Sequence, residues 1–256
     1  MRKSSLTNCI ILSPNHSGKR THKMDRITPH CVVGQLSAES IGHCFDNKNR
    51  KASCNYGIGK EGRVCLVVDE DNRSWCTSSN SNDQRAITIE CASDSKHPYT
   101  FTDACYNKLI DLTVDICKRY NKTKLVWISN KEKALAYKPK DNELQITVHR
   151  WFADKSCPGD WMMSKMNDYV NKVNSKLTSE VKPVKHKINN NTNNNLHYQV
   201  KVTASTLNYR KGPGINYDIN GTITNKGIYT IIEESNGWGK LKSGEGWISL
   251  KYTKKL

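Results

Sequence analysis

The chain has 256 residues and carries 40 Lys and Arg against 24 Asp and Glu, which gives a formal net charge of +16. Tryptophan, tyrosine and β-branched residues are spread along most of the sequence, and this composition excludes chain-wide disorder. No stretch approaches the roughly 18 consecutive apolar residues of a transmembrane helix, so we expect no membrane insertion. The N-terminal apolar run Cys9–Leu12 is shorter than the core of roughly 7–15 residues in a signal peptide, and we expect synthesis in the cytoplasm.

The chain contains ten cysteines, and no two of them form a C-x-x-C pair. This spacing argues against a zinc ribbon and against a thioredoxin-like redox motif. Most of the thiols have apolar neighbours, as Cys65 does between Val64 and Leu66. We therefore expect reduced cysteines that fill the core as small hydrophobic side chains, with Cys157 as the exception.

The first part of the chain alternates segments of strand character with segments of helical spacing. Strands are predicted over residues 62–69, 86–91, 124–128 and 144–148, and helices over 102–120 and 160–177. Apolar residues recur at helical spacing in both predicted helices, and Thr102 is a suitable N-cap for the first. Strands that alternate with helices predict an α/β sheet layered with helices.

The composition changes sharply after the second predicted helix. Residues 178–198 are polar, rich in asparagine and without apolar periodicity, which is typical of a linker. Residues 199–256 contain short strand-like runs separated by glycine turns, a pattern that predicts a small all-β barrel. This second part has no cluster of His, Cys and carboxylates, so we interpret residues 1–177 as the catalytic domain and 199–256 as a binding module.

Residues that could ligate a metal stand in two separated segments. His30 lies in an apolar, strand-like run, His149 ends a predicted strand, and Cys157 follows in the next loop. Two histidines and a thiolate are three zinc ligands, and a catalytic zinc keeps its fourth position open for water. Two alternatives remain from the residues alone: histidines that only form hydrogen bonds, and Asp154 as a ligand in place of Cys157.

Three separated motifs of the chain together resemble those of one enzyme family. They read H-x5-K-x-C-P-G at 149–159, T-P-H-C-V-V at 28–33 and A-I-T-I-E at 86–90. Together they resemble the zinc-dependent N-acetylmuramoyl-L-alanine amidases, whose fold, a mixed central β-sheet flanked by helices, is shared with peptidoglycan recognition proteins. Residues 199–256 are similar to bacterial SH3 domains through the segments L-N-Y-R-K-G-P-G-I-N-Y, S-N-G-W-G-K and G-W-I-S.

The amidase resemblance implies that His30, His149 and Cys157 bind zinc. It also implies that Lys155 faces the substrate and stabilises the oxyanion of the attacked amide. Glu90 is a carboxylate within an apolar strand, and burial raises the pKa of such a group toward the range that suits a general base.

The family places either a tyrosine or this glutamate in the role of general base. Counting back from Gly62 puts the tyrosine position at Cys54, so Glu90 is favoured. Tyr56 is kept as the second candidate, because it would share a strand face with Cys54.

Two further residues, Trp75 and Asn82, are expected to line the substrate groove, although Trp75 also suits a core position. The resemblance implies hydrolysis of the bond between N-acetylmuramic acid and L-alanine in a Gram-positive wall, by a phage endolysin released through a holin pore. A bacterial autolysin and a non-catalytic peptidoglycan-binding protein remain alternatives. The positive charge suits the anionic wall, and no nucleic-acid-binding motif accompanies it.

Overall fold

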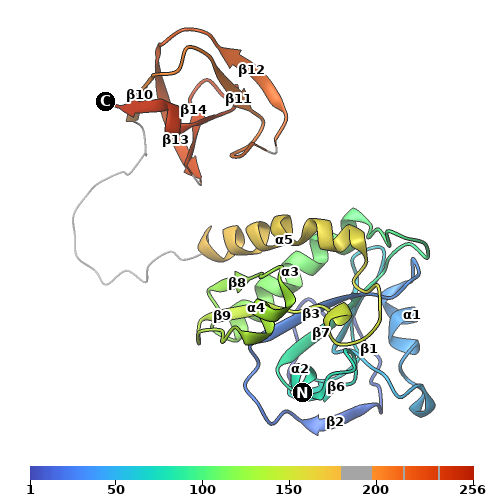
Figure 1. Cartoon of the computed structure of the whole chain (residues 1–256). Helices are drawn as coiled ribbons and strands as arrows, with labels where there is room; N and C mark the ends of the chain where they lie inside the picture. The colour runs from blue at the N-terminus through green and yellow to red at the C-terminus, as the bar shows by residue number, and fades with distance from the viewer. Residues whose placement is uncertain (180–197, 216, 236) are drawn as a thin grey trace. The chain divides into compact units, whose positions relative to one another are not determined.

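The computed structural model describes residues 1–179, 198–215, 217–235 and 237–256 (Figure 1). They form two compact units, one on each side of segment 180–197. The predicted linker lies outside the described residues except at its ends, where the last helix of the first unit reaches Ser179 and a strand of the second begins at Tyr198. The predicted boundaries of the catalytic and binding domains stay predictions. No helix in the described ranges combines the length and the apolar character needed to cross a membrane.

The first unit is built on a seven-stranded mixed sheet, with the strand order β1-β5-β4-β7-β3-β9-β8. Strands β4, β7, β3, β9 and β8 run parallel, whereas β5 is antiparallel to β4 and pairs in parallel with β1. The strands are β1 (Cys9–Ile10), β3 (Arg26–Cys31), β4 (Tyr56–Ile58), β5 (Val64–Leu66), β7 (Ala86–Cys91), β8 (Lys124–Val126) and β9 (Glu143–Ile146). A separate two-stranded ribbon joins β2 (His16–Lys19) to β6 (Asn72–Ser74). The predicted mixed sheet is confirmed.

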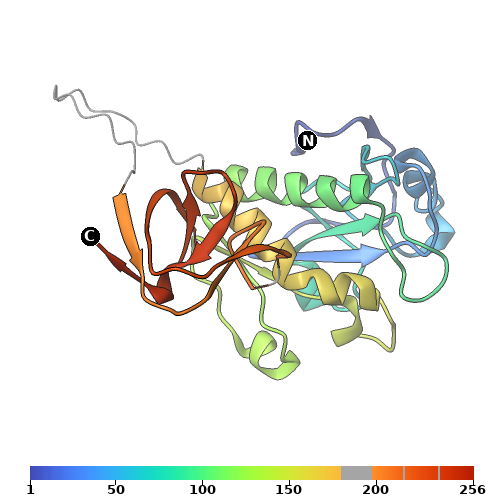
Figure 2. The ribbon, with the colours of Figure 1, turned by 90° about the horizontal axis from the view of Figure 1, so that it is seen from above.

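Helices cover both faces of this sheet. The long helices α3 (Asp103–Arg119) and α5 (Asp160–Ser179) lie side by side over one face (Figures 1 and 2). Thr102 caps α3 as predicted, because its hydroxyl accepts a hydrogen bond from the backbone N–H of Cys105. The remaining helices are α1 (Ala38–His43), α2 (Asn80–Asp83) and α4 (Lys131–Ala136).

Helix α1 packs against the sheet at a glycine. A Cβ on Gly57 of β4 would meet Cγ2 of Ile41 in α1 at 2.5 Å, so only glycine allows this close approach. The neighbouring residue Ile58 lies on the other side, where its carbonyl faces the thiol of Cys105 in α3. The core around the sheet is therefore divided between an α1 face and an α3–α5 face.

The second unit is an antiparallel sheet with the strand order β12-β11-β15-β14-β13-β10-β16. Its strands are β10 (Tyr198–Val202), β11 (Leu207–Arg210), β12 (Ile219–Ile223), β13 (Ile228–Ser235), β14 (Trp238–Leu241), β15 (Trp247–Ser249) and β16 (Thr253–Lys255). A small aliphatic core includes Val200, Ile231 and Ile248. The all-β character is confirmed, and the SH3-like barrel stays a prediction.

Candidate metal centre

The candidate ligands come from the carboxyl ends of parallel strands. His30 is near the end of β3, and its register partner on β7 is Glu90. His149 follows β9 at the start of a short 3₁₀ helix, His149–Trp151. Because parallel strands place their carboxyl ends at one edge, three segments far apart in sequence meet there.

The loop that supplies Cys157 is held in place by Arg150. The Arg150 guanidinium donates to Asp160 Oδ1 at 2.9 Å and to the carbonyl of Ser156, while the Arg150 backbone N–H donates to the Cys157 carbonyl. Gly159 closes the loop with φ of +87°, a left-handed conformation that favours glycine. The Pro-Gly pair of the sequence motif therefore ends the loop directly before α5.

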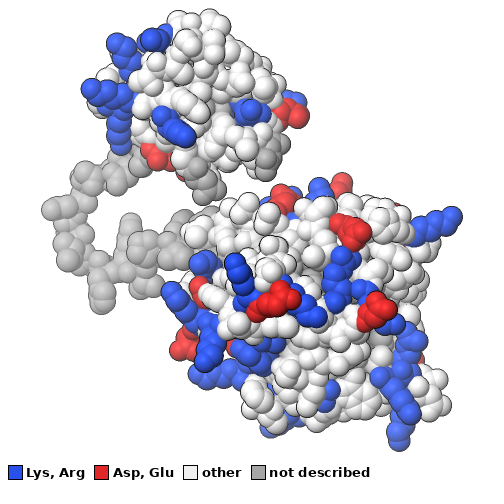
Figure 3. All heavy atoms as spheres, viewed as in Figure 1, with Lys and Arg blue, Asp and Glu red and all other residues white. Residues whose placement is uncertain are grey.

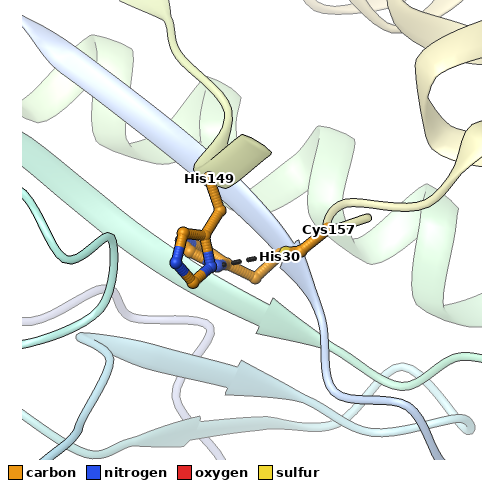
Figure 4. Close-up of side chains that lie close together, drawn as sticks. All are labelled: His30, His149 and Cys157. Carbon is orange, nitrogen blue, oxygen red and sulfur yellow. Dashed lines mark hydrogen bonds between the residues drawn. The ribbon is translucent and has the colours of Figure 1, made fainter. Parts of the chain in front are cut away.

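His30, His149 and Cys157 converge on one point (Figure 4). Each offers one ligand atom, and these atoms lie within 4.8 Å of one another. The Cys157 Sγ is 3.3 Å from Nδ1 of His30, and the two imidazole centroids are 5.0 Å apart. His30 is buried, with 1% exposure, so its position is fixed by the surrounding core.

The protonation states suit a cation at this point. Burial, and then the neighbouring His149, lower the pKa of His30 well below its usual value. Burial and the charge of Lys155 lower the pKa of His149. Burial, and then contact with the Cys31 thiol, raise the pKa of Cys157. Both imidazoles are therefore neutral near pH 7, and the thiol loses its proton only when a cation replaces it.

Glu90 lies beside this cluster. Its Oε1 is 3.9 Å from Nδ1 of His30 and 3.9 Å from the Sγ of Cys76. Burial raises the pKa of Glu90 to about 7. Its second oxygen, Oε2, is buried and has no hydrogen-bond partner among the described residues. A carboxyl with this pKa can both accept and return a proton near neutral pH.

A cavity of about 520 Å³ opens over the cluster. Lys155 and Trp75 are among the residues that line it, and their roles as catalytic lysine and groove residue stay predictions. Trp75 is half-buried, and its indole N–H donates to Ser17 Oγ at 2.7 Å, which orients the ring. Two arginines that sequence reasoning missed, Arg50 and Arg73, line the same cavity.

Tyr56 is not at the site, and this corrects the second candidate for the general base. Its hydroxyl donates to Glu70 Oε1 at 2.6 Å and accepts from the Ser4 backbone N–H at 2.7 Å. In the pairing of β4 with β7, Gly57 lies opposite Glu90. Successive side chains of a strand point to opposite faces of the sheet, so the side chain of Tyr56 lies on the face opposite to that of Glu90. The expectation failed because β4 begins only at Tyr56, and strand alternation cannot be counted back to Cys54.

Asn82 is also not in the groove. It is fully buried, and its side-chain amide bonds to Arg26, Thr28 and Thr147 inside the unit. These bonds use its donor and acceptor groups, so none is directed to a substrate. The alternative ligand Asp154 is exposed and belongs to no group of converging metal donors in the described part of the chain.

Sequence reasoning treated most cysteines as core residues and so missed a group of thiols at the site. Cys31, Cys44 and Cys76 line the cavity together with Cys157. Cys54 is buried, and the charge of Glu90 contributes to raising its pKa. These five thiols are spread over separate segments of the chain, and nothing in their spacing signals that they meet.

Comparison with known proteins identifies a family model, described as N-acetylmuramoyl-L-alanine amidase, that matches residues 20–160. Among solved structures, a mutant endolysin from Bacillus subtilis is 12% identical, with a TM-score of 0.48 and coverage of 65% of this chain and 99% of that one. The structure of PlyL is 15% identical (TM-score 0.46, coverage 64% and 94%). The N-acetylmuramoyl-L-alanine amidase LysC from Clostridium intestinale URNW is 16% identical (TM-score 0.40, coverage 62% and 97%). A search among curated proteins found no match.

Proposed function

The chain belongs to the family of N-acetylmuramoyl-L-alanine amidases, and we propose that it hydrolyses its substrate with a zinc ion bound by His30, His149 and Cys157. It is a peptidoglycan amidase, since the family match covers more than half of its residues. The observation that carries the zinc proposal is the convergence of these three donors from separate segments within 4.8 Å.

The donor set fits zinc in its chemistry and its environment. Two imidazoles and one thiolate are ligands that Zn²⁺ prefers, and three protein ligands are typical of a catalytic site. Nδ1 of His30, a fully buried residue, lies 3.3 Å from the Cys157 Sγ, and a cation in the cluster would take the place of the thiol proton between these two donors. When bound, zinc supplies Lewis acidity that polarises the scissile carbonyl and makes water a better nucleophile.

Glu90 is the proposed general base. Its carboxylate takes a proton from the attacking water and returns it to the nitrogen of the leaving L-alanine. The burial that raises its pKa to about 7 makes both transfers favourable near neutral pH. The hydrogen bond of Tyr56 to Glu70, on the sheet face opposite to Glu90, supports the choice of Glu90 over Tyr56.

Lys155 and Trp75 are proposed to act on the substrate. Lys155 is exposed at the cavity and close enough to His149 to lower the pKa of that imidazole. Its ammonium group would stabilise the negative charge that develops on the carbonyl oxygen during attack. Trp75 offers a flat apolar surface on the cavity wall, which suits packing against the glycan or the peptide stem.

The C-terminal unit is proposed to be an SH3-like module that holds the enzyme on a Gram-positive wall. Lys and Arg side chains are spread over both units on the face drawn in Figure 3, and the chain has a net charge of +16. This charge attracts the protein to the anionic polymers of the wall. The combination of a catalytic unit and a proposed wall-binding unit in one chain supports the proposal that the protein is a phage endolysin, made in the cytoplasm and released through a holin pore.

The test is a digest of purified Gram-positive walls by the full chain, before and after removal and return of zinc. We expect new L-alanine amino termini with intact glycan strands, detected by mass spectrometry, and loss of this release on chelation. New reducing sugar ends would indicate a glycosidase instead. Binding to walls without cleavage would indicate a non-catalytic peptidoglycan-binding protein. Reaction unaffected by complete metal removal would exclude the zinc mechanism.

A further inference from the structure

We propose that the same cavity holds a second, alternative metal position, formed by His30, Cys76 and Glu90. The inference rests on the proposed function, since His30 belongs to both positions. One ligand atom from each residue lies within 4.8 Å of the other two. The distances from Glu90 Oε1 to His30 Nδ1 and to Cys76 Sγ are both 3.9 Å. Donor atoms around a tetrahedral zinc are roughly 3.3–3.6 Å apart, so small side-chain adjustments suffice.

The backbone fixes all three donors. His30 and Glu90 are register partners on adjacent parallel strands, and their side chains project from the same sheet face. Cys76 follows β6, and Asp83 holds its segment: Oδ2 of Asp83 accepts from the backbone N–H groups of Cys76 and Thr77. The position is therefore built into the fold and does not depend on an exposed loop closing over it.

The surroundings of Glu90 also favour a cation. The side chain is 13% exposed, and its Oε2 lacks a hydrogen-bond partner among the described residues. The Cys76 thiol and the His30 imidazole, which approach Oε1, are both at 3.9 Å, too far for a strong hydrogen bond to oxygen. A buried carboxylate with so little compensation is costly when charged, and direct coordination would remove much of this cost.

The two positions exclude each other. Nδ1 of His30 is 3.3 Å from Cys157 Sγ and 3.9 Å from Glu90 Oε1, so the same nitrogen faces both donor sets. An ion in the second position would use Glu90 as a ligand, and that carboxylate would no longer be free to accept a proton from water. The second position is consequently one that retains metal without hydrolysis. Its mixed imidazole, thiolate and carboxylate donors suit Zn²⁺, Co²⁺ or a softer divalent ion.

Cobalt binding to the full-length, metal-stripped protein tests the proposal, because a cobalt–thiolate bond gives a charge-transfer absorption band independent of activity. We expect Cys157→Ala to keep about one equivalent of Co²⁺ and the thiolate band, while wall hydrolysis is lost. The double variant Cys157→Ala/Cys76→Ala should lose the band. Cys157→Ala/Glu90→Gln should lose the bound cobalt, since a neutral amide is a poor substitute for a carboxylate ligand.

Cys44 provides the matched control, since it lines the same cavity but belongs to neither donor set. Cys157→Ala/Cys44→Ala should keep the cobalt and the band. The proposal is wrong if Cys157→Ala/Cys76→Ala keeps the band and Cys157→Ala/Cys31→Ala loses it, because Cys31 and not Cys76 would then be the thiolate ligand of the second position.

The remaining outcomes separate this inference from the proposed function. Cobalt bound by the parent protein but not by Cys157→Ala overturns the second position and leaves the hydrolytic site intact. A parent protein that binds no metal overturns both. Circular dichroism and thermal unfolding verify that each variant is folded. If an alanine variant does not fold, the more conservative variants Cys157→Ser and Cys157→Ser/Cys76→Ser are used in its place.

Discussion

Nδ1 of His30 lies 3.3 Å from the sulfur of Cys157, although 127 residues separate the two along the chain. The contact exists because β3 delivers the imidazole to the carboxyl edge of the sheet, and the loop before α5 folds back over that edge. Burial of His30 and the Arg150 contacts of the loop fix the two partners independently. The site is therefore preorganised by the backbone before any ion binds.

Replacement of His149 by alanine should abolish wall hydrolysis. The change removes one of three proposed ligands and leaves two donors, too few for a stable catalytic zinc site. Release of L-alanine amino termini from purified walls measures the effect. His43→Ala is the matched control, because His43 is exposed, does not line the cavity and forms an ion pair with Asp46 at an N–O distance of 2.8 Å. Equal loss in both variants would show that the effect is not specific to the site.

Glu90→Gln should slow turnover by roughly 10²–10⁴-fold, the range expected for loss of a general base. The amide keeps the size of the side chain but cannot accept the proton from water. Steady-state kinetics on a soluble muramyl-peptide substrate, together with the zinc content of the variant, measures the change. Near-normal turnover with zinc still bound would assign proton transfer to solvent or to another group.

Glu90 should also make the metal-free protein less stable as the pH rises. Burial raises the pKa of Glu90 from 4.5 to about 7, so between these values the folded state holds a proton that the unfolded state has released. The stability linked to Glu90 is therefore highest below pH 4.5 and falls as the pH approaches 7.

The variant Glu90→Gln lacks this dependence. Between pH values below 4.5 and above 7, its free energy of unfolding should therefore rise by about 3 kcal/mol relative to that of the parent protein. Urea unfolding of both chelated proteins at about pH 4 and about pH 8 isolates the contribution of Glu90. Groups distant from Glu90 titrate alike in both proteins and cancel in the comparison. A constant difference between the two proteins would mean that Glu90 is not held in its neutral form.

Deletion of residues 199–256 should weaken attachment to walls without changing the bond that is cut. A tethered binding module keeps the catalytic unit near the wall, and such linkage can raise overall affinity by roughly 10²-fold or more in favourable geometries. Sedimentation with purified walls measures attachment, and mass spectrometry identifies the products. Hydrolysis of a soluble muramyl peptide, which needs no tether, serves as the control and should be unchanged. Full attachment by the truncated chain would assign wall binding to the first unit.

Much of the fold could be predicted from local pattern. Apolar spacing and the Thr102 cap located α3, and α5 was found by the same periodicity, because both helices bury one face. The strand at 86–91 was found with its full extent, because apolar and β-branched residues predominate in it, as is typical of a buried parallel strand. Strand order and direction were not predictable, since they depend on contacts between residues distant in sequence.

The same distinction between local pattern and long-range contacts holds for the candidate site. The motif around His149, Lys155 and Cys157 indicated which side chains are candidates for the chemistry, because chemical type and short spacing are properties of the chain itself. The register of β4 and β7 turned Tyr56 away from Glu90, and the packing inside the first unit buried Asn82. Neither fact is encoded by a local pattern.

The sequence by itself thus determined the family, the two-part organisation and the chemical identity of the proposed zinc donors. Only the tertiary structure decided which thiols surround Glu90, and it brought Cys76 within reach of both Glu90 and His30. The physical reason is that donor type is a property of single residues, whereas the geometry needed to hold an ion arises only when separate strands and loops are packed together.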